Sequence, residues 1–262
     1  MAAGEEGLSY LAALLLGLLQ GVAEFLPVSS SGHLALAEHL GYGGGIPLAF
    51  DLLLHLATVL VVLRTFWEDI RRILRSERRV LLYLAAGSVP AGALGVLFRD
   101  TFADIREKPL AVSAALLVTA GFLFFCDRIA GGARRQGELG VKSSLVIGLA
   151  QALAITPGIS RSGLTITGGV VCGLTRREAI RFSFLLMVPA VCGASLLDAV
   201  RYGSDWTGLP PGPAFVGFLA AFVSGTASLR FLTSFVLHRR LSIFAVYCVV
   251  VGLAGILYFS LR

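Results

Sequence analysis

The stretch Gly17–Gly32, GLLQGVAEFLPVSSSG, returns later in the chain as Gly148–Gly163, GLAQALAITPGISRSG. The two segments align without a gap, and seven positions are identical, including a glutamine and the closing Ser-x-Ser-Gly. Their spacing is 131 residues, which is half of the 262-residue chain. The match predicts an internal duplication, with repeat one over about 8–127 and repeat two over about 141–261.

Each of these segments has the pattern of a helix that breaks and resumes. Helices are predicted over Leu8–Leu26 and Leu34–Leu40 in repeat one, and over Leu145–Ile155 and Leu164–Cys172 in repeat two, with a Pro/Gly/Ser cluster between the members of each pair. Polar, irregular backbone at membrane depth survives only where protein buries it or water reaches it. We therefore predict two re-entrant elements. The pattern alone also allows Leu8–Leu26 to be an ordinary spanning helix that ends in a surface loop.

The composition predicts an all-α integral membrane protein, because 56% of the residues are hydrophobic and only 15% are charged. Six further apolar runs reach the ~17 to 25 residues that cross a bilayer as a helix. These six predicted spans cover Ile46–Leu63, Val80–Phe98, Pro109–Cys126, Phe182–Val200, Ala214–Leu237 and Leu241–Leu261. Together with the two re-entrant elements they form one predicted membrane domain over 1–262.

The positive charges predict how the chain is oriented. The net charge of +6 gives no reason to expect a nucleic-acid partner, because the basic residues gather in short loops between apolar runs. Fifteen Lys/Arg fall in one alternate set of loops and five in the other set and the termini. Positively charged loops stay in the cytoplasm, which places the first set inside: 64–79, 128–142, 174–181 and 238–240. Three crossings per repeat invert the second repeat, so the two Ser-x-Ser-Gly motifs are expected to face each other near the midplane.

Two polar residues of the first helix, Gln20 and Glu24, lie four apart on one helical face. A carboxylate in an apolar segment costs about 2.5 to 3.5 kcal/mol on insertion scales, so Glu24 is a functional candidate by default. The alternative is a structural partner for a buried cation. Gln20 is weaker evidence, since an amide inside a helix bundle often makes only an interhelical hydrogen bond.

A serine cluster with a histidine follows in the first break, as Ser29, Ser30, Ser31 and His33. In most proteins a serine run before a helix is an N-cap. His33 favours a chemical role instead, because histidine moves protons near neutral pH.

Arg161 lies in the second break, and a buried guanidinium requires a carboxylate or a phosphate that it can bind with two N–H groups. Gly32 and Gly163 each precede a predicted helix, whose N-terminal N–H groups attract anions. These groups together predict a phosphate pocket. Thr165 either donates to that phosphate or bonds back to its own helix. Outside the breaks, Asp51 and His55 are four residues apart and either support the site or pair only with each other.

The motifs QGVAEFLPVSSSGH (Gln20–His33) and PGISRSG (Pro157–Gly163), followed by TRREAIRFSFLLMVPAV, resemble the undecaprenyl-diphosphate phosphatase family associated with bacitracin resistance. The resemblance covers nearly the whole chain. It implies six spanning helices with two re-entrant elements in inverted repeat, and hydrolysis of a polyprenyl diphosphate lipid to its monophosphate, which recycles the carrier lipid for cell-wall synthesis. It also implies a divalent cation and a pocket open to the outer face of the bacterial cytoplasmic membrane.

The family's motif residues carry over position by position. Its acidic motif falls on Gln20 and Glu24, its serine/histidine motif on Ser29, Ser30, Ser31 and His33, and its arginine motif on Ser160, Arg161 and Ser162. Many members have Glu where this chain has Gln20, so the cation is expected on Glu24.

The implied mechanism has Mg²⁺ or Ca²⁺ shared between Glu24 and the diphosphate. Ser30 is the expected nucleophile and His33 the general acid or base, while attack by water or by histidine stays open. The broken, inverted helices also suit a transporter or flippase for a phosphorylated lipid. The many small residues permit close packing of helices in the membrane, which leaves a monomer and a homodimer equally open.

Overall fold

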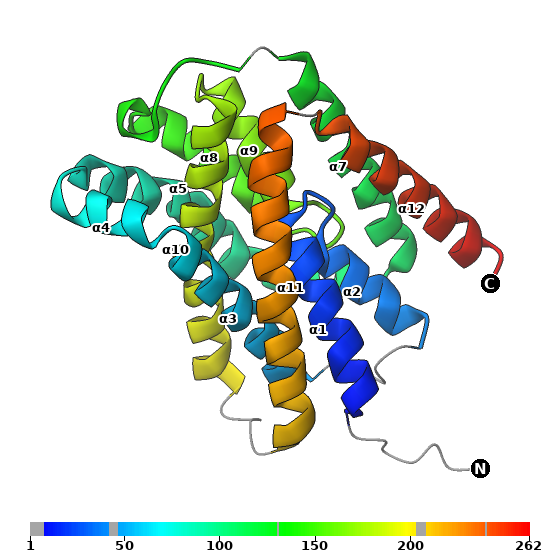
Figure 1. Cartoon of the computed structure of the whole chain (residues 1–262). Helices are drawn as coiled ribbons and strands as arrows, with labels where there is room; N and C mark the ends of the chain where they lie inside the picture. The colour runs from blue at the N-terminus through cyan, green and yellow to red at the C-terminus, as the bar shows by residue number, and fades with distance from the viewer. Residues whose placement is uncertain (1–7, 42–46, 130, 203–207, 239) are drawn as a thin grey trace, which may run out of the picture.

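The computed structural model describes residues 8–41, 47–129, 131–202, 208–238 and 240–262, and most of them are helical (Figure 1). The only strand-like pairing within these ranges is an isolated bridge between Arg134 and Leu174. The predicted start of the first apolar run at Ile46, and parts of the predicted loops 128–142 and 238–240, lie outside the described residues.

The described part of the chain contains six helices that are long and apolar enough to cross a membrane. They are α3 (Leu48–Thr65), α5 (Arg78–Leu97), α7 (Pro109–Arg128), α10 (Arg176–Tyr202), α11 (Pro211–His238) and α12 (Ser242–Ser260). Each coincides with one predicted run, so the prediction of six spans is confirmed. The chain is a multi-pass membrane protein.

Four shorter helices form the predicted broken segments, α1 (Tyr10–Phe25), α2 (Ser30–His39), α8 (Val141–Leu153) and α9 (Arg161–Val171). The prediction that Gly32 and Gly163 precede their helices is wrong, because both lie inside the first turn. The cause is a serine N-cap in each break. The Gly32 N–H donates to Ser29 Oγ at 3.2 Å, and the Gly163 N–H donates to Ser160 Oγ at 3.1 Å.

Two of the predicted loops contain short amphipathic helices, α4 (Trp67–Arg75) and α6 (Arg99–Arg106). The α4 helix buries Ile73 and exposes its basic residues. A single 3₁₀ turn, η1 (Gln136–Glu138), lies between α7 and α8.

Ion pairs and a hydrogen bond connect segments in or beside the basic loops at one end of the bundle. Arg181 Nε lies 3.8 Å from Asp69 Oδ2. Asp127 accepts from Arg176 Nη2 at 3.2 Å and from the Ser242 N–H at 2.7 Å, which links the starts of α10 and α12 to the end of α7. These contacts place the basic loops together, as the charge count predicts.

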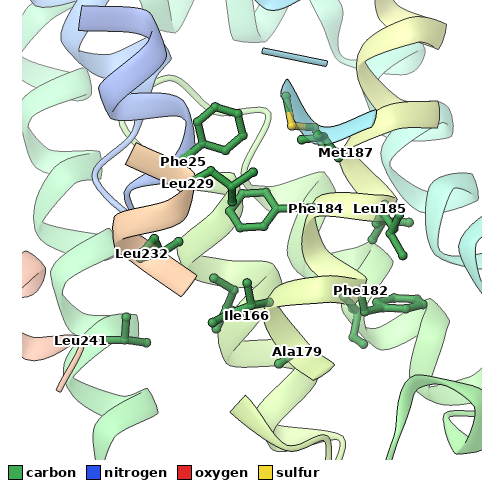
Figure 2. Close-up of a cluster of buried hydrophobic side chains, with 14 of the residues drawn as sticks. Phe25, Ile166, Ala179, Phe182, Phe184, Leu185, Met187, Leu229, Leu232 and Leu241 are labelled. Atoms are coloured by element: carbon green, nitrogen blue, oxygen red, sulfur yellow. The ribbon is translucent and has the colours of Figure 1, made fainter. Parts of the chain in front are cut away.

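The main hydrophobic core includes buried residues of α1, α9, α10 and α11, several of them labelled in Figure 2, and it continues into α3, α7 and α12. Phe25 and Phe184 meet with ring centroids 5.5 Å apart, and both side chains are fully buried. Phe25 directly follows Glu24 in the chain. Arg161 holds its guanidinium carbon 6.0 Å from the Phe184 ring centre. The core thus anchors the Glu24 carboxylate and the Arg161 guanidinium, which are both predicted site groups.

Candidate active site

Glu24, in the last turn of α1, is the centre of a buried hydrogen-bond network. Its Oε1 accepts from Arg161 Nη2 at 2.5 Å. Its Oε2 accepts from Ser30 Oγ at 2.5 Å and from Gln20 Nε2 at 3.2 Å. Only 8% of Glu24 is exposed. One carboxylate therefore joins an arginine of the second break to a serine of the first.

The two breaks also touch through their backbones. Ser162 Oγ donates to the Leu26 carbonyl at 3.3 Å. A Cβ at Gly32 would lie 2.7 Å from Gly158 Cα, so only glycine fits at this contact. Thr119 of α7 supports the second break, since its Oγ1 donates to the Gly158 carbonyl and accepts from the Ser160 N–H, both at 2.9 Å. The two Ser-x-Ser-Gly motifs of the internal repeat therefore lie together and form one site.

A cavity of about 180 Å³ opens between the two breaks. Its polar wall consists of Glu24, Ser29, Ser30, Ser31, His55, Ser160, Arg161 and Ser162. Its apolar wall consists of Ala23, Ala154, Ile155, Ile159 and Val191. A polar end beside an apolar wall suits an amphipathic ligand with a charged head.

Arg161, which lines this cavity, has a buried donor without a partner in the described part of the chain. Nη2 is bound to Glu24, but the buried Nη1 has no hydrogen-bond partner among the described residues. An unsatisfied buried N–H of a charged group is costly, so it is expected to bind an anion. Ser29, on the same wall, has φ 69° and ψ 94° and is the only non-glycine residue with positive φ in the described ranges. Such strain of about 1–3 kcal/mol is concentrated at functional sites.

The remaining predicted site residues do not line the cavity. Gln20 supports Glu24 from one turn below, and its own Oε1 is buried without a partner. Thr165 Oγ1 donates back to the Arg161 carbonyl at 2.8 Å and shares a hydrogen bond with Ser183. Gly32 and Gly163 are buried first-turn residues that allow close packing.

His33 also lies off the cavity wall. Its Nδ1 is 2.8 Å from the Ser29 carbonyl, its Nε2 is 2.8 Å from the Tyr247 hydroxyl, and its ring stacks on that tyrosine. Direct proton transfer by His33 stays a prediction, and it requires release of the Tyr247 hydrogen bond.

His55 of α3 is the histidine that lines the cavity. Its Nε2 lies 4.0 Å from Glu24 Oε2 and its Nδ1 lies 3.7 Å from Asp51 Oδ1. In the sequence, only the spacing of four residues between Asp51 and His55 hinted at this position.

Asp51 also binds Arg106 of α6. Burial lowers the pKa of Arg106, but the nearby carboxylates of Asp51 and Glu38 outweigh this effect and raise that pKa above its ordinary value.

Substitution of Gly32 by alanine tests the contact between the breaks. The added Cβ would meet the Gly158 backbone, which cannot move aside as a flexible side chain can. We expect a stability loss of about 1–3 kcal/mol from overpacking. Displacement of the groups around Glu24 should also lower any turnover at this site about 10²-fold.

Thermal unfolding in detergent and a turnover assay measure the two effects. Gly121→Ala is the control, because this exposed α7 glycine has nothing within 4 Å of the added Cβ. Parent-like stability and activity in Gly32→Ala would contradict the observed contact.

Comparison with known proteins assigns this chain to a family. The family described as bacitracin resistance protein BacA matches residues 13–254. An undecaprenyl-diphosphatase of Syntrophotalea carbinolica is 43% identical over 256 residues, covering 94% of this chain and 97% of the relative. An undecaprenyl-diphosphatase of Bacteroides thetaiotaomicron is 39% identical over 263 residues, with 95% and 99% covered. The chain therefore belongs to the bacitracin resistance protein BacA family.

Proposed function

We propose that the chain is an undecaprenyl-diphosphate phosphatase, which hydrolyses undecaprenyl diphosphate to undecaprenyl phosphate and phosphate. The observation that carries this proposal is that Arg161, whose buried Nη1 has no partner among the described residues, lines a cavity whose other polar groups are serines, a histidine and one carboxylate. The names of the relatives support the same activity. The product is the carrier lipid that cell-wall synthesis reuses.

Ser30 is the nucleophile in the mechanism that we infer. Its Oγ attacks the terminal phosphorus, the bond from that phosphorus to the bridging oxygen breaks, and undecaprenyl phosphate leaves. The Ser30 proton passes to Glu24 Oε2, which already accepts its hydrogen bond. Water then attacks the phosphoserine and the bond from phosphorus to Oγ breaks. Glu24 returns the proton to Ser30 Oγ, and the proton of the water leaves on the phosphate.

Arg161 couples substrate binding to the activation of Glu24. The guanidinium neutralises charge on the transferred phosphoryl group, where catalysis is largely positioning and electrostatics. A phosphate at Nη1 competes with Glu24 for the same positive charge. Glu24 consequently becomes a stronger base when the substrate is in place.

A divalent cation fits this site only when the substrate shares it. The described residues hold no cluster of three His, Cys, Asp or Glu side chains suited to a metal. Glu24, which lines the cavity, would hold Mg²⁺ or Ca²⁺ jointly with the diphosphate, because hard cations accept carboxylate and phosphate oxygens. The bound cation would supply charge neutralisation for the leaving lipid phosphate.

The two broken segments are proposed to be re-entrant. At 16 and 13 residues, α1 and α8 extend about 24 Å and about 20 Å, less than the ~30 Å of hydrocarbon. Cys172, which follows α9, donates through Sγ to the Ser143 carbonyl at the start of α8, so the second segment ends beside its own beginning.

Matched contacts support an inverted repeat. Gly17 of α1 packs against the Gly217 carbonyl of α11, and Gly148 of α8 packs against the Gly87 carbonyl of α5. The serine caps in the two breaks correspond as well. In a bacterial cytoplasmic membrane with the basic loops inside, we infer that the cavity opens to the outer face.

The test of function is phosphate release from undecaprenyl diphosphate by the purified chain in detergent with Mg²⁺ or Ca²⁺. We expect turnover that falls at least about tenfold with EDTA and returns with the cation, as hard-cation dependence requires. A folded protein that binds the lipid yet releases no phosphate would favour the transporter or flippase reading instead.

A further inference from the structure

Three histidines of this chain share one local geometry. In His33, His39 and His55 the ring Nδ1 lies 2.8, 2.8 and 2.9 Å from the backbone carbonyl four residues earlier. A carbonyl oxygen can only accept, so Nδ1 carries the hydrogen in this contact. The helix backbone thereby fixes the orientation of each ring. The role of each histidine then depends on the group that its Nε2 contacts.

Two of these Nε2 atoms are occupied by the protein itself. His33 Nε2 lies 2.8 Å from the Tyr247 hydroxyl, and His39 Nε2 lies 3.2 Å from the Glu107 carbonyl. His55 Nε2 instead lies on the cavity side, 4.0 Å from Glu24 Oε2, which is longer than a hydrogen bond. Among these three rings, His55 alone lines the cavity.

A chain of charged groups holds the His55 ring from behind. Asp51 Oδ1 is 3.7 Å from Nδ1, and Asp51 Oδ2 is 3.5 Å from Arg106 Nη1. Arg106 in turn donates to both oxygens of Glu38, each at 3.2 Å. The chain runs from α3 through α6 to α2, so the ring position is set by three elements.

We propose that His55 contacts the substrate, donating a hydrogen bond from Nε2 to the diphosphate that Arg161 holds. This inference rests on the proposed function and adds a residue to its binding site. Arg161 and His55 both reach the oxygens of Glu24, so they flank the place where an anion would lie. With a proton on each nitrogen, the ring donates through Nδ1 to the Asp51 carbonyl and through Nε2 to the diphosphate. The role is donation of one N–H, not proton transfer.

Three substitutions at this position separate donation from mere packing. His55→Leu removes the donor, His55→Gln keeps an N–H at a similar reach, and His55→Asn keeps the amide but shortens it. We expect kcat/KM for undecaprenyl diphosphate to fall about 10- to 100-fold in the Leu and Asn variants, the loss of one hydrogen bond to a charged group. His55→Gln should recover to within about threefold of the parent.

His39→Leu is the matched control, because it removes a ring with the same backbone contact away from the cavity. It should leave kcat/KM within about twofold of the parent, the usual range for a change outside the site.

Affinity for a non-hydrolysable farnesyl methylenediphosphonate gives a readout that a structural role would not move. By calorimetry, we expect its Kd to rise about tenfold in His55→Leu and His55→Asn, and to stay unchanged in His39→Leu. A parent-like Kd in both His55 variants would overturn the proposal, even if turnover fell. If the parent binds the analogue through His55 but releases no phosphate, the proposed function fails and the diphosphate contact stands.

Discussion

Replacement of Ser30 by alanine is expected to reduce phosphate release by at least about 10⁴-fold, the scale of loss when a nucleophile of a coupled catalytic set is removed. Ser30 Oγ donates to Glu24 Oε2 at 2.5 Å, so the proposed nucleophile and its proposed base are already in contact. The measurement is phosphate release under saturating lipid, with mass spectrometry of acid-quenched enzyme for a phosphoserine at this position.

Ser31→Ala is the control for Ser30→Ala. Ser31 lines the same cavity, but its described hydrogen bond is only a 3.4 Å contact with Ser29 Oγ. Its loss should cost less than about tenfold, as expected for one neutral hydrogen bond. If Ser30→Ala retained a tenth of the parent activity and the parent gave no phosphoserine, direct attack by water would replace the serine mechanism.

The spans were predictable because a bilayer imposes a length. A helix such as α12 must present about 20 apolar residues to lipid, so the sequence shows its extent directly. The breaks were predictable for a related reason, since Pro, Gly and Ser interrupt an apolar run only where something else satisfies the backbone. The predicted start of α10 at Phe182 was late, because its first turn at Arg176 is charged and pairs with Asp127 outside the apolar run.

The site was only partly predictable, because residue type and spacing do not say which way a side chain is turned. Glu24, Ser30 and Arg161 were identified because charge and hydroxyl groups in apolar segments require partners, and the structure brings these three together. His33 and His55 have the same backbone contact, so no local pattern distinguishes them. His33 is hydrogen-bonded to Tyr247, which lies 214 residues away in the chain. His55 reaches the cavity because α3 packs beside α1.

Substitution of Arg161 by lysine is expected to lower kcat/KM by about 10³-fold or more, within the range for removal of an arginine that stabilises phosphoryl transfer. An ammonium can keep the ion pair with Glu24. It lacks the planar fork that binds the carboxylate through Nη2 while Nη1 remains for phosphate. Phosphate release across lipid concentrations measures the loss. Arg176→Lys is the control, since Arg176 pairs with buried Asp127 at the other end of the bundle.

Arg161 and Glu24 also allow stability to be separated from catalysis. Arg161→Met leaves the Glu24 charge buried and unpaired, which should cost about 3–5 kcal/mol. Adding Glu24→Gln removes that charge, so the double variant should regain most of the lost stability in thermal unfolding while releasing no more phosphate than either single variant. Recovery of activity together with stability would show that the pair only holds the breaks in place. Recovery of stability alone would show that the pair serves catalysis beyond holding the breaks in place, because the double variant is folded but lacks both the guanidinium and the proposed base.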